Sequence, residues 1–385
     1  MEVEIGKGKF GRRAYGFDDI AIVPSRRTRD PQDVGICTRI ADFHFKLPVL
    51  ASAMDGVVDP EFAIKMGKLG GLAVLNLEGL QTKYEDSSSV LKEISSFSKE
   101  EATRKMQELY KEPIKPELVG KRIEEIKKGG VIAAASITPQ KVTQYYKIAI
   151  DAGLDILIIQ GTVVSAEHVS TTCEVLDLNK FIKSVSIPVI VGGCCSYSAA
   201  LHLMRTGAAG ILVGVGPGAA CTTRQVLGVG VPQATAIADA TAARTRYLDE
   251  TGKYVKVIAD GGMRTGGDIA KAIACGADMV MIGSPLARAK EAPGRGYHWG
   301  MATFHPDLPR GTRVCTGIAG SLEEILVGPA RENDGTLNLF GALRTSMATC
   351  GYKDIKDFQQ AEVMIAPSLK TEGKFLQRAQ GVGMG

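Results

Sequence analysis

The feature that most constrains this chain is a series of short apolar runs, rich in β-branched residues, that each end at a glycine or a small polar residue. Continuous apolar runs of this length are typical of parallel strands buried on both faces. Glycines cluster just after the runs, where a strand ends in a loop that can approach a ligand closely. The runs are residues 49–54, 72–77, 131–137, 156–160, 189–193, 211–215, 255–260 and 279–283.

Segments with helical spacing follow these runs, for example at 60–69, 139–152, 198–206 and 267–274. The runs and their helices occupy about 235 residues, against roughly 250 for a typical eight-stranded α/β barrel. We therefore predict an α/β fold, a (β/α)8 TIM barrel, with residues 1–385 as a single catalytic domain. A doubly wound sheet is the alternative. It requires a reversal of strand order that a sequence does not reveal, and eight evenly repeated units favour closure.

Two stretches interrupt the repeat. Residues 81–130 are rich in Lys, Glu and Ser and are predicted to form polar helices, at 99–111 and 116–128, in a solvated insertion between the second and third strands. Residues 285–330 contain several prolines and glycines and little periodicity. Within them we expect 295–320 to form a short flap over the barrel mouth.

Composition excludes several classes of protein. The balance of 46 Lys and Arg against 42 Asp and Glu gives a net charge of only +4, which argues against a nucleic-acid partner. No apolar run reaches the ~18 residues of a membrane span, and the first residues lack the pattern of a secretory signal. Eight scattered cysteines without a CxxC pair, and no HExxH motif, argue against structural zinc. We expect a cytoplasmic protein.

A glycine-rich loop with a cysteine follows the sixth run. Residues 214–224 contain three glycines, Cys221 and two threonines. At the mouth of a barrel, such a cysteine is a candidate nucleophile, provided that nearby donors stabilise its thiolate. The alternative is that Cys221 is a small buried hydrophobe.

An aspartate and further glycines follow the seventh and eighth runs, at Asp260-Gly261-Gly262 and Gly283-Ser284. In barrels, these loops often hold a phosphate through backbone N–H groups. An ionised Asp260 can accept hydrogen bonds from two ribose hydroxyls, so the pattern suggests a nucleoside monophosphate. Alternatively, the glycines form tight turns and Asp260 caps the next helix. Trp299, in the expected flap, either stacks on a base or packs internally.

Taken together, these residues resemble the IMP dehydrogenase/GMP reductase family, and the resemblance covers nearly the whole chain. The branch it resembles most lacks the paired CBS regulatory domain, for which 81–130 is too short. The motifs that carry the resemblance are GFDDI at 16–20, ASAMD at 51–55, the cysteine loop, GVGVPQ at 228–233, ADGG at 259–262, MIGS at 281–284, EAPG at 291–294 and GM at 300–301.

The resemblance implies a barrel enzyme that acts at C2 of a purine nucleotide, GMP or IMP, with NADPH or NADH as cofactor, in a homotetramer or octamer. Its catalytic residues would be Cys221, which attacks C2, with Thr223 and Thr316. The carbonyls of Gly216, Gly218 and Cys221 match the family's loop for a monovalent cation such as K⁺. Substrate-binding residues would be Ser52, Met54, Gly218, Asp260, Gly261, Gly262, Gly283, Ser284, His298, Gly300 and Met301. Cofactor-binding residues would be Gln160, Gly161, Thr162, Gly214 and Gly216.

Several positions depart from the family pattern. Ala219 replaces a phosphate-binding serine, and Gln160 replaces an aspartate that faces the nicotinamide ribose. Gly193 stands where asparagine is common, Thr316 where the family has Gln or Glu, and His298 where the dehydrogenase has a phosphate-binding tyrosine.

The flap bears on the direction of the reaction. A dehydrogenase must hydrolyse the thioimidate on the cysteine, and the family's dehydrogenases use an Arg-Tyr pair on a long flap for this step. Only 14 residues separate Met301 from Thr316, without an Arg-Tyr dipeptide, although Arg310 and Arg313 are present. This favours reduction of GMP to IMP. IMP dehydrogenation and a nucleotide-binding regulator without turnover remain the alternatives.

Overall fold

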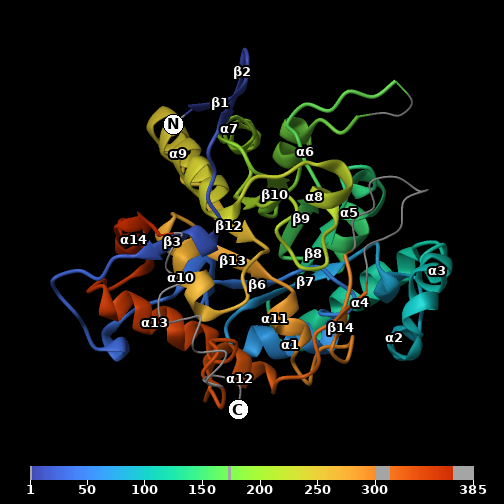
Figure 1. Cartoon of the computed structure of the whole chain (residues 1–385). Helices are drawn as coiled ribbons and strands as arrows, with labels where there is room; N and C mark the ends of the chain where they lie inside the picture. Colours follow the sequence, from blue (N-terminus) through green and yellow to red (C-terminus); the bar gives the residue numbers. More distant parts are fainter. Residues whose placement is uncertain (1, 172–174, 301–312, 367–385) are drawn as a thin grey trace.

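Eight parallel strands close into a barrel in the computed structural model of the chain, which describes residues 2–171, 175–300 and 313–366 (Figure 1). The strands follow one another around the barrel in sequence order, and the last pairs with the first. This confirms the predicted (β/α)8 fold against the doubly wound sheet. The strands are β6 (Val49–Ala51), β7 (Leu72–Asn76), β8 (Ala134–Ile137), β9 (Ile156–Gln160), β10 (Val189–Cys194), β11 (Gly210–Val213), β12 (Lys256–Asp260) and β13 (Met279–Ile282).

Helices cover the outside of the barrel, and apolar residues on one face of each pack against the strands. Several of them begin at a side-chain cap: Asp59 accepts from the Phe62 amide before α1, and Thr265 forms a capping box with Asp268 before α10. The helices are α1 (Pro60–Lys68), α4 (Pro116–Lys128), α5 (Val142–Asp151), α6 (Leu178–Ser184), α7 (Tyr197–Arg205), α8 (Thr223–Leu227), α9 (Gln233–Thr251), α10 (Gly266–Ala274), α11 (Ser284–Ala287), α12 (Leu322–Val327), α13 (Leu339–Thr349) and α14 (Ile355–Phe358).

The barrel interior is a second apolar layer, made by alternate residues of the strands. Leu72 and Val74 of β7 point inward, as do Ile156 and Ile158 of β9 and Ile258 of β12, whereas the residues between them belong to the outer core. The hairpin of β4 (Thr38–Ile40) and β5 (Phe43–Phe45) contributes further apolar side chains to the inner layer, just before the chain enters β6. Side chains therefore fill the barrel, and a ligand is expected at the carboxyl ends of the strands.

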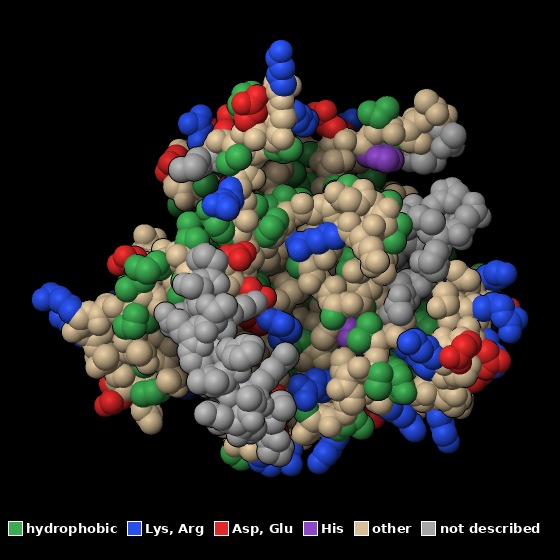
Figure 2. Space-filling model, viewed as in Figure 1, with side chains coloured by type: hydrophobic (Ala, Val, Ile, Leu, Met, Phe, Trp, Pro, Cys, Tyr) green, Lys and Arg blue, Asp and Glu red, His purple; other side chains and the backbone are tan. Residues whose placement is uncertain are grey.

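The stretch 81–130 divides into two parts. Helices α2 (Ser87–Ser96) and α3 (Lys99–Leu109) project from the barrel, and Figure 2 shows charged side chains of both signs over them. Helix α4, in contrast, packs between α1 and α5 and buries Val119, Ile123 and Ile126 in the outer core. The projecting insertion is thus smaller than 81–130, because the last of its predicted polar helices is a barrel helix with one apolar face.

Short strands complete the fold. The N-terminal hairpin of β1 (Glu2–Gly6) and β2 (Lys9–Arg12) extends away from the barrel, and β3 (Ile20–Ile22) pairs with β16 (Val363–Ile365) (Figure 1). The base of the expected flap forms a small antiparallel pair, β14 (Tyr297–His298) with β15 (Val314–Cys315). In the described part of the chain, no helix is long and apolar enough to cross a membrane.

Candidate active site

A ring of polar residues and glycines lies directly above the apolar layer of the barrel. Alternate residues of a strand face the same side, so the residue two positions beyond the apolar layer also faces inward. On every barrel strand this residue is small or polar. These eight positions lie at one end of the barrel, and five of them hold site residues expected from sequence. The eight residues are Ser52, Asn76, Ser136, Gln160, Gly192, Gly214, Asp260 and Gly283. Asn76 and Ser136 were missed by the sequence analysis, although counting alternate residues along the runs would have found them.

Asp260 lies in a hydrogen-bonded chain across the barrel mouth. Gln160 Nε2 donates to Asp260 Oδ2 at 3.1 Å, and Ser136 Oγ donates to Gln160 Oε1 at 3.3 Å. Burial raises the pKa of Asp260 to about 7, and the hydrogen bond from Gln160 opposes this shift. The next helix, α10, is capped by Thr265. The alternative that Asp260 is a helix cap is therefore wrong.

Gln233 supports the backbone below this carboxylate. Its Nε2 donates to Val213 O at 2.7 Å and to Asp260 O at 3.1 Å, which ties α9 to the ends of β11 and β12. Gln233 belongs to the GVGVPQ motif but was not among the expected site residues. Its role is structural in this arrangement, because it holds two strand ends in register beneath the mouth.

The cysteine loop presents its sulfur to solvent. Cys221 is exposed, so the alternative of a small buried hydrophobe is wrong. Its Sγ lies 3.1 Å from Oγ1 of Thr223, a fully buried residue at the start of α8. A hydroxyl at this distance can donate a hydrogen bond to a thiolate, which is the support that a cysteine nucleophile needs.

The cysteine loop rests on the turn that carries Asp260. A Cβ on Gly261 would lie 3.3 Å from Gly218 N, and one on Gly262 would lie 3.0 Å from Pro217 Cβ. Both glycines have positive φ angles, +79° and +82°, so the turn needs glycine for its conformation as well as its size. Cys221 N donates to Gly218 O at 3.0 Å. One lone pair of that carbonyl is thus used within the loop, and the other could still face the expected monovalent cation.

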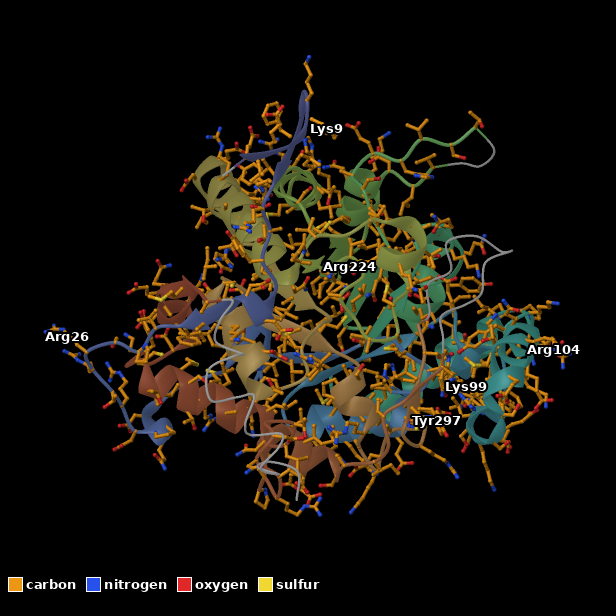
Figure 3. The ribbon with its side chains drawn as sticks, viewed as in Figure 1. Lys9, Arg26, Lys99, Arg104, Arg224 and Tyr297 are labelled. Atoms are coloured by element: carbon orange, nitrogen blue, oxygen red, sulfur yellow. The ribbon has the colours of Figure 1, made fainter. Side chains whose placement is uncertain are left out.

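Arg224 holds the far side of the cysteine loop. Its Nε donates to Val215 O at 3.1 Å and its guanidinium also donates to Val231 O at 2.6 Å. Figure 3 shows Arg224 near the centre of the view, over the strands of the barrel. These bonds connect the beginning of the loop with the GVGVPQ segment and fix the path of the chain around Cys221.

The residues expected at the cofactor side also meet. Gly161 N donates to Gly192 O at 2.9 Å, and Gly193 N donates to Gly161 O at 3.1 Å. A Cβ on Gly193 would lie 2.4 Å from Gly214 O and 3.5 Å from Thr162 O. The departure from asparagine at this position thus has a steric reason, since no side chain fits beside the carbonyl of Gly214.

Substitution of Gly193 by alanine is expected to destabilise the protein. The new methyl group must displace the backbone of Gly214, which costs about 1–3 kcal/mol of the free energy of unfolding. The matched control is Gly267→Ala in α10, where the nearest atom to a new Cβ is 3.7 Å away. Urea denaturation of both variants measures the difference. Equal stability of the two would contradict the steric argument.

A second group of residues gathers where β6 and β13 end. A Cβ on Gly283 would lie 2.7 Å from Met54 Sδ and 3.5 Å from Ser52 Oγ. Ser284 follows as the first residue of α11, which packs against β14 and therefore near His298. His298 is 1% exposed, and neither ring nitrogen has a hydrogen-bond partner in the described residues. Burial lowers its pKa to about 4, so the imidazole is neutral.

The remaining expected residues lie in or beside the flap. Thr316 Oγ1 donates to Gly296 O at 3.0 Å, and in the described residues no hydrogen bond joins Thr316 to the cysteine loop. Gly300 is half-buried and ends the described part before the flap, whereas Met301 and Arg310 lie outside the described residues. The structure thus brings Thr316 to the flap base and does not pair it with Cys221.

The insertion holds both sides of the flap base. Trp299 is fully buried, and its Nε1 donates to Tyr110 Oη at 2.7 Å, while Tyr110 Oη donates to Asp55 Oδ2 at 2.5 Å. On the other side, Arg313 stacks on Tyr297 and donates to backbone carbonyls at the end of α2. Figure 3 shows Tyr297 close to the insertion that carries Lys99 and Arg104. Of the two alternatives for Trp299, internal packing is the one observed.

Substitution of Tyr110 by phenylalanine is expected to lower the free energy of unfolding by about 2 kcal/mol, because it leaves the buried Trp299 N–H without its acceptor. The control is Tyr84→Phe in the same insertion, whose hydroxyl donates to Leu109 O in a half-buried position and is worth about 1 kcal/mol. Trp299 is the sole tryptophan of the chain. Its fluorescence therefore reports on this site, and unchanged emission in Tyr110→Phe would contradict the assignment.

A model of the IMP dehydrogenase/GMP reductase domain matches residues 14–374. The chain belongs to the IMP dehydrogenase/GMP reductase family. It is 46% identical to a solved IMP dehydrogenase/GMP reductase-like protein from Corynebacterium glutamicum, with a TM-score of 0.90 and coverage of 94% of this chain and 97% of that one.

Curated relatives agree with this assignment. An uncharacterized oxidoreductase of Mycolicibacterium smegmatis is 47% identical over 94% of this chain and 99% of its own. The inosine-5'-monophosphate dehydrogenase of Cryptosporidium parvum is 31% identical over 92% of this chain and 90% of its own. The chain is thus an oxidoreductase of a family that binds purine nucleoside monophosphates and uses nicotinamide dinucleotides.

Proposed function

We propose that this family member is a GMP reductase, which converts GMP to IMP and ammonia with NADPH or NADH and forms a covalent bond between Cys221 and C2 of the purine. The nucleotide would span the barrel mouth, with its ribose on Asp260 and its phosphate at the ends of β6 and β13. Gln160, Gly161, Thr162, Gly214 and Gly216 would face the nicotinamide.

The phosphate position is supported by polar groups that have no hydrogen-bond partner in the described residues. Ser52 and Ser284 supply hydroxyls, and Ser52 Oγ lies 3.5 Å from the position of a Cβ on Gly283, so the hydroxyl of Ser52 adjoins the backbone at the end of β13. His298 has two buried ring nitrogens without partners in the described part of the chain. Buried polar groups are normally satisfied, so an incoming phosphate is a natural acceptor for an imidazole N–H. His298 would then take the place of the family's tyrosine.

The chemistry at C2 follows from the cysteine and its threonine. The sulfur of Cys221 attacks C2 of GMP, the C2–N bond breaks, and the amino group takes up a proton and leaves as ammonia. A bound nicotinamide cofactor would supply the hydride that C2 needs at this point. The S–C2 bond then breaks, which returns its electron pair to the sulfur of Cys221 and releases IMP. The hydroxyl of Thr223 can donate to the sulfur whenever it carries negative charge, at the start and at the end of the cycle.

The environment of Arg313 is the observation that carries the choice of direction. A dehydrogenase needs a base to activate water for hydrolysis of the thioimidate. In the described residues the guanidinium of Arg313 is held by carbonyls of Ile94 and Phe97 and by the ring of Tyr297, so it is committed to the insertion. Of the two flap arginines considered from sequence, this one is therefore an unsuitable base, and a reaction without hydrolysis is favoured.

Assays in both directions test the proposal. Purified protein is mixed with GMP and either NADPH or NADH, and the absorbance of the reduced nicotinamide is followed together with IMP and ammonia. IMP with NAD⁺ is assayed in parallel. We expect equimolar IMP, ammonia and oxidised cofactor from GMP. Formation of XMP from IMP would instead identify a dehydrogenase, and a flat trace with measurable IMP binding would favour the regulator.

The affinity for the ribose is expected to rise with pH. In the free protein, burial raises the pKa of Asp260 to about 7, so part of the population is protonated at neutral pH. Ribose hydroxyls donate to the carboxylate, so binding favours the ionised form of Asp260. The affinity should therefore increase with pH, by up to about tenfold per pH unit while the pH is below about 7, and should level off above that value. Binding of the nucleoside guanosine, which has no phosphate to titrate, measures this between pH 5.5 and 8.5. The slope should disappear in Asp260→Asn.

A further inference from the structure

A cluster of charged side chains surrounds one aromatic ring at the opposite end of β12 and β13. We call the residues Arg244, Tyr254, Lys256, Asp278 and Lys356 the basal cluster. The Lys356 ammonium lies 3.6 Å from the centroid of the Tyr254 ring, and the Lys256 ammonium and the Arg244 guanidinium each lie 4.9 Å from it. The cluster joins α9, the starts of two barrel strands and α14 (Figure 1).

The single carboxylate of the basal cluster already has its partners. Arg244 donates to Asp278 Oδ2 at 2.8 Å, and so does the amide of Val257 at 2.9 Å. Tyr254 Oη donates to Asp278 Oδ1 at 2.6 Å, and Gln359 Nε2 donates to the same oxygen at 3.3 Å. The buried Arg244–Asp278 pair is therefore neutral as a unit, and the two lysines add uncompensated positive charge beside it.

Lys356 is the accessible cation of the basal cluster. It is exposed, and no hydrogen bond or ion pair of its ammonium is found in the described residues, whereas Lys256 is only 3.8 Å from Asp278 and mostly buried. The pKa of Lys356 is lowered to about 8, chiefly by partial burial and also by the positive charges of Arg244 and Lys256, while Asp278 opposes the shift. Burial and the charges of Arg244 and Arg39 likewise lower the pKa of Lys256. Among the described residues, Asp278 is the one carboxylate that raises the pKa of either lysine.

We propose that the basal cluster binds a tetrahedral oxyanion, inorganic phosphate or a phosphomonoester, with Lys356 as the contact residue and Lys256 and Arg244 as sources of positive potential. An anion here would offset the repulsion between the cations, and Lys356 can leave the Tyr254 ring to reach it because its side chain is long and exposed. The site is separate from the nucleotide site, because Lys256 and Asp260 occupy the two ends of β12, roughly 13 Å apart at 3.3 Å per residue.

Competition for the Lys356 amine tests the proposal on the unmodified protein. Brief treatment with acetic anhydride, followed by mass spectrometry, measures the acetylation rate of each lysine with and without inorganic phosphate or ribose 5-phosphate at matched ionic strength. We expect at least threefold protection of Lys356 by one of the two. Lys353 is the control, because it is exposed in the same region, is paired with Asp357 and should react at an unchanged rate. Protection by phosphate alone identifies the free anion, and stronger protection by the sugar phosphate identifies a phosphomonoester.

A pair of variants provides the second arm. Phosphate should raise the melting temperature of the wild type and of Lys353→Gln equally, and Lys356→Gln should lose a measurable part of this shift. Binding of phosphate at the nucleotide site contributes to all three proteins alike and cancels in the comparison. Unprotected Lys356, together with identical shifts in the three proteins, would overturn the proposal and leave Lys356 as a cation that only stacks on Tyr254.

Discussion

Turnover is expected to disappear when Cys221 is replaced by serine, with a loss of at least about 10³-fold in kcat. Serine retains the position of the heteroatom, but its hydroxyl is a far weaker nucleophile than a thiolate at neutral pH. The side-chain contact found at this position in the described residues is the hydroxyl of Thr223, which is not a general base. IMP affinity should stay within about tenfold, because the ribose and phosphate contacts remain. Initial rates and equilibrium binding of IMP measure the two quantities separately.

The control for this variant is Cys37→Ser, since Cys37 is also exposed and free but lies before the barrel. It should keep full activity. A covalent adduct offers an independent readout: trapping of the wild type with GMP should add the mass of the purine nucleotide residue to the peptide that contains Cys221. If Cys221→Ser turns over normally, another group attacks C2 and the covalent proposal fails.

Loss of the Asp260 carboxylate is expected to weaken nucleotide binding by about 100-fold or more in Asp260→Ala, because hydrogen bonds to a charged acceptor are worth about 1.5–3 kcal/mol each and two hydroxyls would lose theirs. Asp239→Asn is the control, since that carboxylate pairs with Arg12 on the surface of α9. Titration of IMP by calorimetry measures both. Wild-type affinity in Asp260→Ala would place the ribose elsewhere in the mouth.

The ionised carboxylate of Asp260 is also expected to lower the free energy of unfolding at alkaline pH. Its pKa is raised in the folded state, so the stability it contributes is present at low pH and is lost as pH rises through about 7. Asp260→Asn removes the titration. We therefore expect this variant to melt at a higher temperature than the wild type at pH 8, although it binds nucleotide poorly, which would separate a binding defect from misfolding.

The strands and most helices of the barrel could be predicted closely, whereas the place of α4 in the fold could not. The run at 156–160 coincides with β9, and the run at 72–77 exceeds β7 by one residue. Strand identity is local, because a buried parallel strand is apolar at every position. The Lys- and Glu-rich sequence of α4 predicts a helix of a polar insertion. Only its contact with α1 and α5 shows that its narrow apolar face belongs to the barrel.

The site could be predicted in its residues but not in its pairings. Asp260, Gln160 and Cys221 were all named from motifs, yet the hydrogen bond between Gln160 and Asp260 joins residues 100 positions apart. The commitment of Arg313 to the end of α2 likewise spans more than 200 positions. No local pattern encodes such contacts, because they depend on how distant strands and loops are brought together.

By itself, the sequence determined the barrel, the family and the chemical groups at the mouth, because hydrophobic periodicity and short glycine-rich motifs act over a few residues. Only the tertiary structure decided which groups at the mouth form hydrogen bonds with one another, which side chains are exposed, and which cations are left without a counter-charge. Those properties arise from burial and from distances between segments, and neither exists until the strands close around a common core.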